Sequence, residues 1–375
     1  MKKILKGSIP SELFQSSVFI YGGGNTGVSV LKILKSYSVH IEYIIDDDLN
    51  KWGKKVEGVE IISYQQFVEK CKYIKDIAVV MGTIYGRSIL RRFSETTSDV
   101  DVYEIYNWLV EEYGLKNFIA GVNDKNEIEQ FRNESCKVKA FLADDESKKV
   151  LDGVYNYLVS NELDFISNIC TEQKQYFIPE VLAAIKQPLN IVDGGAYVGE
   201  LYRTIEENNI NLEHWYCFET DTENYEKLLK NAKKMGLSEV QQCIKKGLWD
   251  KESVLYFDGD KDTASRVVSY PTDRKIETIS LDIYFKDKNC NFIKMDIEGA
   301  EYPALCGGIE TIKRDRPILA ISIYHSLKDY YRIPKYLRSE LQGYTYYIRH
   351  HSLILCETVL YAIPNELTDN ICSEE

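Results

Sequence analysis

The chain has 375 residues, of which 44% are hydrophobic and 28% are charged. These values are typical of a globular protein of about two domains, and they exclude a disordered or collagen-like chain. The 58 acidic residues outnumber the 46 lysines and arginines, so the formal net charge is -12. This acidic balance argues against a general nucleic-acid-binding surface.

The nine cysteines are scattered singly, with no pair at C-x-x-C spacing. This pattern argues against a disulfide framework or a zinc ribbon and favours a reducing compartment. No apolar run approaches the ~20 residues of a membrane span, and the N-terminus lacks the apolar region of a signal peptide. The sequence therefore predicts a cytoplasmic protein without a membrane span. It leaves the oligomeric state open, a homo-oligomer included.

The first organised segment follows a strand–turn–helix–strand pattern. Residues 18–21 are a short apolar run of β-formers, and a glycine-rich stretch over 22–27 follows directly. Apolar residues then recur at helical spacing over 28–34, and a second apolar run over 41–45 ends at Asp46. This order predicts a βαβ unit with a parallel sheet.

The glycine-rich stretch has the G-x-G-x-x-G spacing of a dinucleotide-binding loop, with an acid about 20 residues further on. Glycines let the backbone approach a pyrophosphate at a helix N-terminus, and the acid accepts a ribose hydroxyl. Three interpretations stay open: a nucleotide or nucleotide sugar, NAD, or no ligand, with glycines that only permit tight packing. The predicted second ligand site comprises Gly22, Gly24, Asn25, Thr26, Gly27 and Asp46.

Residues 124–182 alternate charged and apolar residues at helical spacing and contain few strand signals. They predict two or three helices that link or cap the flanking segments. From residue 188 onward the alternation of strands and helices returns. The predicted fold class is therefore α/β with two Rossmann-like units. The predicted division is a Rossmann-like domain over 1–123, a helical linker or cap over 124–187, and a second α/β domain over 188–375.

The second glycine loop, from Asp193 to Gly199, differs from the first because an acid stands at the strand end. Glu219 ends the next predicted strand. A ligand with an amino-acid moiety and a nucleoside suits this pattern: Asp193 can take an ammonium directly or through water, and Glu219 can accept both ribose hydroxyls. That ligand is S-adenosylmethionine. The predicted cofactor-binding residues are Asp193, Gly194, Gly195, Ala196, Tyr197, Gly199, Glu219 and Asp221.

A third feature is a group of carboxylates after the predicted strand over 292–295. Asp296, Glu298 and Glu301 are costly to place near a core without a positive partner. A sulfonium, a substrate cation or a metal ion would supply that charge. We interpret Glu301 as favourable charge at a helix N-terminus, and Asp296 and Glu298 as functional.

These stretches resemble the FkbM family of S-adenosylmethionine-dependent methyltransferases, within the class I methyltransferase fold. The resemblance covers roughly 138–364 and is carried by residues 192–199, 218–221, 292–301, 317–325 and 357–362. It implies a seven-stranded, mostly parallel sheet with an antiparallel last strand. This agrees with the last two predicted strands, 345–349 and 357–361, which are too close together for a helix between them and predict a hairpin.

The family resemblance also implies O-methyl transfer, often to sugars or related natural products such as polyketides. The N-terminal segment is similar to a small Rossmann-like domain found ahead of sugar-modifying enzymes, which contacts a nucleotide sugar in its relatives. The expected partners are thus a small-molecule or glycan substrate and a nucleotide sugar at the N-terminal domain.

Methyl transfer to a hydroxyl requires an aligned acceptor oxygen and removal of its proton. His325 follows a predicted strand, and an ordinary imidazole pKa near ~6.5 suits a general base; a helix N-cap or a packed strand-end residue is the alternative. Asp296 can orient His325, act as the base itself, or hold a divalent metal ion with Glu298. The predicted catalytic residues are Asp296, His325 and Glu298.

Two other functions stay open. An NAD-dependent oxidoreductase would use the first glycine loop as its NAD site. A non-catalytic protein would bind nucleotide sugars within glycan assembly.

Overall fold

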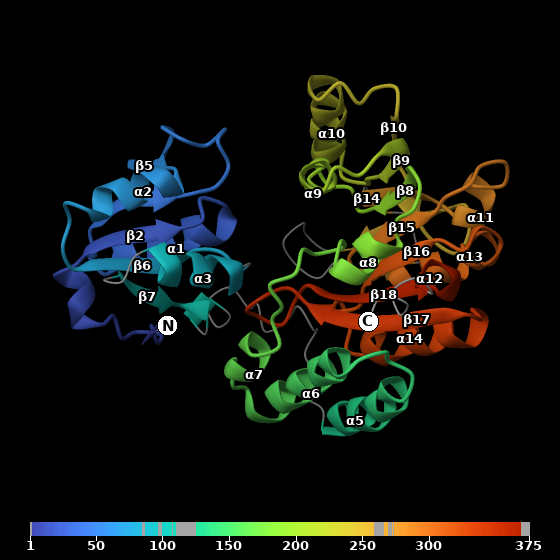
Figure 1. The fold of residues 1–375 in the computed structure, drawn as a ribbon, viewed down its shortest axis with the longest axis horizontal. Coiled ribbons are helices and arrows are strands. Elements are labelled where there is room, and N and C mark those ends of the chain that lie inside the picture. Colours follow the sequence, from blue (N-terminus) through green and yellow to red (C-terminus); the bar gives the residue numbers. More distant parts are fainter. Residues whose placement is uncertain are drawn as a thin grey trace. The chain divides into compact units, whose positions relative to one another are not determined.

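The computed structural model describes residues 2–84, 87–96, 100–106, 108–109, 125–258, 266–268, 272 and 274–368 (Figure 1). The chain divides into two compact units that are discontinuous in sequence. Unit 1 comprises Met1–Gly121, Ser160–Glu172 and His351–Leu355, and unit 2 comprises Val122–Val159, Gln173–His350 and Cys356–Glu375. The contiguous division over 1–123, 124–187 and 188–375 stays a prediction.

Unit 1 is built on a seven-stranded sheet of order β1-β7-β6-β2-β3-β5-β4. All neighbouring strands are parallel except β4 and β5. The strands are β1 (Lys2–Lys3), β2 (Ser17–Tyr21), β3 (Ile41–Ile45), β4 (Lys55–Val56), β5 (Val59–Ile62), β6 (Ile77–Met81) and β7 (Val100–Glu104). The helices are α1 (Asn25–Ser36), α2 (Tyr64–Cys71), α3 (Arg87–Thr96) and α7 (Asp164–Ser167), with a 3-10 turn over Ser11–Phe14.

The central strand of unit 1 explains its apolar sequence. Residues 18–21 of β2 are all buried, because β2 lies between β3 and β6 and helices cover parallel sheets on both faces. The strand order reverses on either side of β2, so its carboxyl end is a topological switch point. The predicted βαβ pattern is confirmed by the parallel pairing of β2 with β3.

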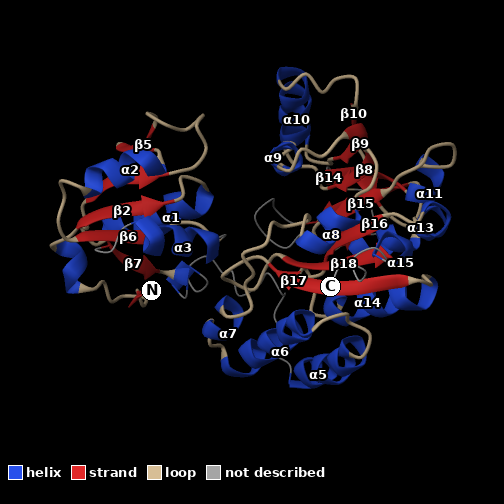
Figure 2. Cartoon of the chain, viewed as in Figure 1, coloured by secondary structure: helices blue, strands red, loops and turns tan. Residues whose placement is uncertain are grey.

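Unit 2 contains a second seven-stranded sheet of order β10-β9-β8-β15-β16-β18-β17 (Figure 2). Its strands are β8 (Leu189–Gly194), β9 (Leu212–Phe218), β10 (Gln241–Ile244), β15 (Phe292–Met295), β16 (Ile318–Ser322), β17 (Tyr344–His350) and β18 (Thr358–Pro364). The strands from β10 to β16 are parallel, and β18 is antiparallel to both β16 and β17. The predicted α/β fold class and the predicted hairpin are therefore confirmed.

The remaining elements of unit 2 are helices and a small sheet. The helices are α5 (Lys125–Lys139), α6 (Asp145–Ser160), α8 (Pro179–Ala184), α9 (Leu201–Glu207), α10 (Thr222–Lys234), α11 (Leu281–Tyr284), α12 (Glu301–Cys306), α13 (Ile309–Asp315), α14 (Asp329–Glu340) and α15 (Asn365–Thr368). The small sheet has the order β11-β14-β12-β13 and comprises β11 (Gly247–Leu248), β12 (Ser253–Asp258), β13 (Arg266–Val268) and β14 (Arg274–Ile279). The sequence analysis did not predict this sheet.

The core of unit 2 forms around its central strands. Phe177, just before α8, stacks on Phe292 of β15 with ring centroids 5.2 Å apart, and both are buried. Fully burying a side chain of this size contributes about 1.5–3 kcal/mol. The stacking fixes the segment before α8 against the sheet, which positions its neighbour Tyr176. Among the described residues, no helix is both long and apolar enough to cross a membrane.

Candidate active site

A buried ion pair lies beneath the second glycine loop. Asp193, near the end of β8, has its Oδ1 2.9 Å from Nζ of Lys294 on β15. Trp215 on β9 donates from Nε1 to Asp193 Oδ2 over 3.2 Å. Lys294 also donates to the backbone oxygens of Gly194 and Gly195 over 3.1 and 2.8 Å. Burial alone would lower the pKa of Lys294, but the neighbouring carboxylate of Asp193 outweighs it and raises that pKa.

The expected direct contact between Asp193 and a ligand ammonium does not fit this geometry. The Asp193 residue is 0% exposed, and both carboxylate oxygens face protein partners. Because Lys294 reaches from this carboxylate to the carbonyl oxygens of the loop, Asp193 supports the loop from below. Its contribution to a ligand site in this conformation is to position the backbone.

The glycine loop approaches the end of β15 so closely that it admits no side chain there. Gly195 has a φ of +71°, and a Cβ atom on it would lie 1.9 Å from the backbone oxygen of Asp296. The N–H groups of Gly195 and Ala196 both donate over 3.0 Å to the carbonyl oxygen of Phe218, which ends β9. Gly199, with a φ of +90°, donates to the Ala196 carbonyl over 2.8 Å. The loop is thus fixed directly beside Asp296.

Glu219 follows β9 and holds two backbone segments. Its Oε2 accepts the N–H of Tyr197 over 2.9 Å, and its Oε1 accepts the N–H of Asp221 over 2.7 Å. Each oxygen keeps a second lone pair for a ligand hydroxyl. Burial raises the pKa of Glu219. Asp221 is the N-cap of α10 and accepts the N–H groups of Glu223 and Asn224, whereas Tyr197 is 48% exposed with a φ of +50°.

Two tyrosine hydroxyls meet at the carboxylate of Asp296. Tyr176 donates to Oδ2 over 2.9 Å, and Tyr324, after β16, donates to Oδ1 over 3.2 Å. The Asp296 side chain keeps 22% exposure, so it is held by the protein and still reachable. Tyr176 has a φ of +67°, which is uncommon for a residue with a side chain.

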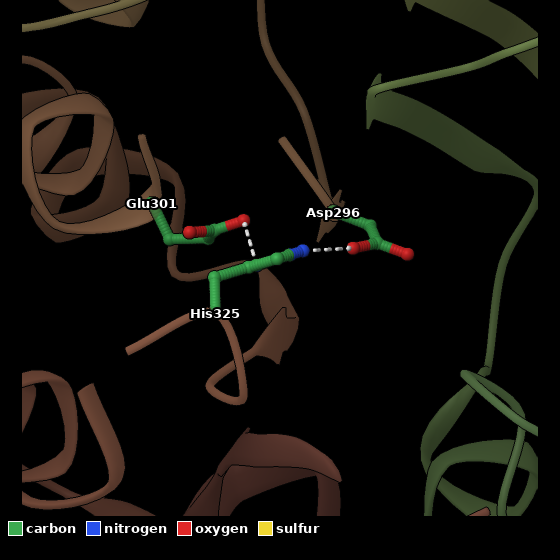
Figure 3. Close-up of side chains that lie close together, drawn as sticks. All are labelled: Asp296, Glu301 and His325. Carbon is green, nitrogen blue, oxygen red and sulfur yellow. Dashed lines mark ion pairs between the residues drawn. The ribbon is translucent and has the colours of Figure 1, made fainter. Parts of the chain in front are cut away.

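His325 lies between two carboxylates (Figure 3). Its Nδ1 is 3.1 Å from Glu301 Oε1, and its Nε2 is 3.5 Å from Asp296 Oδ1. The Nε2 atom is also 3.4 Å from Oε2 of Glu298, whose side chain is 85% exposed. Burial would lower the pKa of His325, but the carboxylates of Glu301, Asp296 and Glu298 outweigh it and raise that pKa to about 9. This direction differs from the ordinary value that the sequence analysis assumed.

Glu301 has more than the role that the sequence analysis gave it. It is the first residue of α12, but it is 0% exposed, and its Oε1 accepts the N–H of Ile297 over 2.7 Å while facing His325. The position of Glu301 three residues after Glu298 in the sequence does not indicate that Glu301 is buried. The turn at Gly299, with a φ of +95°, separates the exposed carboxylate from the buried one.

The first glycine loop lies in unit 1, between β2 and α1. A Cβ atom on Gly22 would lie 2.7 Å from the Gly82 carbonyl oxygen, and one on Gly27 would lie 1.7 Å from the Gly22 carbonyl oxygen. Backbone packing alone therefore requires these two glycines. Gly24 is different, because it is the exposed N-cap residue of α1 and its Cβ atom would meet nothing within 4 Å.

Asp46 follows β3 and fixes the first glycine loop. Its Oδ2 accepts the N–H of Gly23 over 2.6 Å, and its Oδ1 accepts the N–H of Asp48 over 2.8 Å. Asn25 and Thr26 are the first two residues of α1. The predicted residues of this loop thus lie together at the carboxyl ends of β2 and β3.

Comparison with known proteins shows what the chain is similar to. Residues 193–346 match the model of the methyltransferase FkbM domain. The structure of the methyltransferase FkbM from Methylobacillus flagellatus aligns with a TM-score of 0.55 and 22% identity, over 94% of this chain and 94% of that chain. An rRNA methylase from Streptococcus thermophilus aligns with a TM-score of 0.34 and 15% identity, over 52% of this chain and 97% of that one.

A UDP-D-quinovosamine 4-dehydrogenase from Vibrio fischeri aligns with a TM-score of 0.22 and 22% identity, over 26% of this chain and 84% of that one. No curated protein matches. Residues 193–346 are thus similar to the methyltransferase FkbM domain, a family whose name implies S-adenosylmethionine-dependent methylation. The alignment with the Methylobacillus flagellatus structure shows a shared fold.

Proposed function

We propose that this chain transfers a methyl group from S-adenosylmethionine to a hydroxyl of a sugar, a glycan precursor or a related natural product. The observation that supports it most is the contact of Gly195 with the backbone of Asp296, which joins the predicted cofactor loop to the His325 cluster. A methyl donor on the loop and an acceptor at Asp296 would then be neighbours, as in-line displacement requires.

The cofactor is held by the loop from Gly194 to Gly199 and by Glu219. The free lone pairs of the Glu219 carboxylate accept the two ribose hydroxyls. Lys294 and Asp193 keep the loop in shape from below, since Lys294 donates to two of its carbonyl oxygens. Asp221 acts through the start of α10 rather than by touching the ligand.

The proton of the acceptor hydroxyl passes to the cluster of Asp296 and His325. Asp296 is the part of the cluster that combines exposure with two fixed hydroxyl donors. His325 supplies positive charge while it is protonated and accepts a proton only after losing its own. Glu301 faces Nδ1 of His325 and fixes the ring, so that Nε2 of His325 faces the reacting atoms.

A groove lined by residues of α5, α12 and α14 is a candidate surface for a sugar-like acceptor. The groove has a volume of about 610 Å³, and its lining includes Tyr302, Tyr331, Tyr336, Lys328 and Arg332. Tyr302 lies in the first turn of α12 and Lys328 precedes α14, the helices that follow Asp296 and His325. Tyrosines offer an apolar ring and a hydroxyl, a combination that suits faces half packed and half wet.

Calorimetric titration with S-adenosylmethionine tests the cofactor assignment. We expect one binding event with the wild type and binding about 10-fold weaker or more in Glu219→Gln, because a bidentate acceptor is lost. Glu226→Gln, an exposed change on α10, is the matched control and should bind as the wild type does. No heat with the wild type, or equal affinity in Glu219→Gln, would contradict the assignment.

Transfer of labelled methyl groups to a panel of nucleotide sugars and glycan extracts tests the chemistry. Asp296→Asn should slow transfer by about 10²–10⁴-fold, the usual contribution of proton transfer by a positioned group. Its S-adenosylmethionine affinity should change little. Equal turnover in wild type and Asp296→Asn would remove Asp296 from the reaction.

We also propose that the first glycine loop, in unit 1, binds a nucleotide or a nucleotide sugar. Gly24 supports this, since packing within the chain does not explain the lack of a side chain there. Gly24→Ala should leave the melting temperature unchanged and weaken binding of a UDP-sugar, followed by calorimetry. NAD is the parallel probe: tight NAD binding without UDP-sugar binding would favour the oxidoreductase alternative for this unit.

A further inference from the structure

We propose that His325, Asp296 and Glu298 form a binding site for one divalent metal ion, with Glu301, Tyr176 and Tyr324 fixing the ligands from behind. The binding of the ion is independent of the function proposed above. Its catalytic role rests on that function, since an ion here would lower the pKa of an acceptor hydroxyl bound to it.

His325 has the geometry of a metal ligand. Its side chain is 6% exposed, and neither ring nitrogen makes a hydrogen bond of good geometry among the described residues. The Nδ1 atom faces Glu301 Oε1 at 3.1 Å. Metal-binding histidines usually place one nitrogen against a carboxylate in this way, which fixes the ring and leaves the other nitrogen for the ion.

The two carboxylates that face Nε2 stand at distances that suit a shared ion. Asp296 Oδ1 is 3.5 Å away and Glu298 Oε2 is 3.4 Å away, beyond a good hydrogen bond. Two atoms that each lie about 2.1 Å from one ion are about 3.0–3.4 Å apart for angles between octahedral and tetrahedral. The Glu298 pair already meets this condition, and a movement of about 0.1 Å between Asp296 and His325 brings their pair within it.

Asp296 is held as a ligating carboxylate usually is. The hydroxyls of Tyr176 and Tyr324 donate to different oxygens of its carboxylate. Each of these oxygens keeps a lone pair, and hydrogen bonds to ligating carboxylates are a regular feature of metal sites. One atom each of Asp296, Glu301 and His325 lies within 4.8 Å of the others, so the supporting Glu301 and these two ligands form one compact group.

Glu301 is assigned to the supporting layer because Oε1 already faces His325 Nδ1 and accepts the N–H of Ile297. Glu298 takes the remaining ligand position, because it is the carboxylate on the solvent side of the cluster. A set of one imidazole and two carboxylates suits a divalent first-row ion such as Mn²⁺ or Zn²⁺, with water or the acceptor hydroxyl in the open positions.

Titration of the metal-stripped full chain with Mn²⁺ alone tests the site. The electron paramagnetic resonance signal of aqueous Mn²⁺ weakens on binding and reports the free ion. We expect one equivalent to bind without S-adenosylmethionine. Competition with Zn²⁺ and Mg²⁺ then identifies the preferred ion.

Matched variants separate this site from general surface binding. Glu298→Ala is the variant least able to disturb folding, since its side chain is exposed, and it should weaken Mn²⁺ binding at least 10-fold. His325→Gln and Asp296→Asn should do the same or more, and Glu301→Gln should weaken binding by about 10–100-fold, the usual effect of losing such a support. His40→Gln and Asp287→Asn, an exposed histidine and an exposed acid elsewhere, should bind as the wild type does.

Absence of stoichiometric Mn²⁺, Zn²⁺ or Mg²⁺ binding in the wild type would overturn the proposal. Equal loss of affinity in Glu298→Ala and His40→Gln would do so as well. Binding of S-adenosylmethionine is measured on the same samples. If S-adenosylmethionine still binds while metal binding is absent, the metal site is wrong and the proposed cofactor assignment stands.

Discussion

Gly195 and Gly236 have nearly the same backbone conformation but very different surroundings. Their φ angles are +71° and +72°. A Cβ atom on Gly195 would collide with the Asp296 carbonyl oxygen at 1.9 Å, whereas one on Gly236, after α10, would meet nothing within 4 Å. The pair therefore separates the strain of the left-handed conformation from the effect of a close approach.

We expect Gly236→Ala to lower the free energy of unfolding by about 1–2 kcal/mol, the cost of the left-handed conformation for a residue with a Cβ atom. Gly195→Ala should cost clearly more and should also weaken S-adenosylmethionine binding, because the loop must move away from Asp296. Urea unfolding and calorimetry on the two variants measure both effects. Equal destabilisation would mean that the loop and Asp296 are not in contact in solution.

Arg349, at the end of β17, joins several elements of unit 2. It is 1% exposed and donates from Nη2 to Asp144 Oδ2 over 2.7 Å and to Glu180 Oε1 over 2.8 Å. Asp144 precedes α6 and Glu180 lies in the first turn of α8. One buried guanidinium thus attaches both helices to the edge strand, and α8 follows the segment that carries Tyr176.

Replacing Arg349 by Met should lower the free energy of unfolding by about 3–5 kcal/mol at neutral pH, because the carboxylates of Asp144, Glu146 and Glu180 lose their buried cation. Burial alone would raise the pKa of Asp144, but hydrogen bonds from Arg349 and Ser147 hold it below its usual range. In the wild type, the ionised Asp144 carboxylate stabilises the fold at pH values above the pKa that Asp144 has in the unfolded chain. This stabilisation is lost as the pH falls through the lower pKa of Asp144 in the folded chain. In Arg349→Met the effect of burial on the pKa of Asp144 is no longer opposed by Arg349. Protonation of Asp144 at low pH then removes the cost of its buried charge and stabilises the variant.

The difference in stability between wild type and Arg349→Met should therefore shrink as the pH is lowered from about 7 to about 4. Urea unfolding at several pH values measures it. Asp145→Asn, an exposed acid at the start of α6, is the control and should change the pH dependence little. A difference that stays constant over this range would show that Asp144 is not coupled to Arg349.

The elements that the sequence predicted well are those whose pattern depends on local order. The residues before Asp193 and Asp296 are mostly apolar, because helices cover both faces of a parallel sheet, and an acid follows each run near the carboxyl end of the strand. The partners that it missed depend on contacts between distant segments. Tyr176 reaches Asp296 from outside any helix or strand, and Lys294 reads as a lone cation in an apolar strand until Asp193 is beside it.

The whole chain is not a simple succession of units. The segments Ser160–Glu172 and His351–Leu355 belong to unit 1, although the residues on either side of each belong to unit 2. Leu163, just before α7, is 6% exposed, and Ile166, within α7, is 0% exposed. In the second segment, the Leu353 N–H donates to the Ile84 carbonyl over 2.9 Å. The sequence pattern does not reveal that these two segments belong to unit 1, because each resembles an ordinary connection between neighbouring elements.

A fragment over 122–375 should therefore aggregate or melt well below the full chain, although it contains all of unit 2. Removal of residues 1–121 exposes the apolar side chains of the two inserted segments, each of which contributes about 1.5–3 kcal/mol when buried. Size-exclusion chromatography and thermal unfolding measure the effect. The same fragment with Leu163→Ser and Ile166→Ser should be less prone to aggregate, since those side chains have lost their partners. A monodisperse fragment without these substitutions that melts at the temperature of the full chain would contradict this prediction. It would mean that unit 2 is stable although the two inserted segments have lost their partners in unit 1.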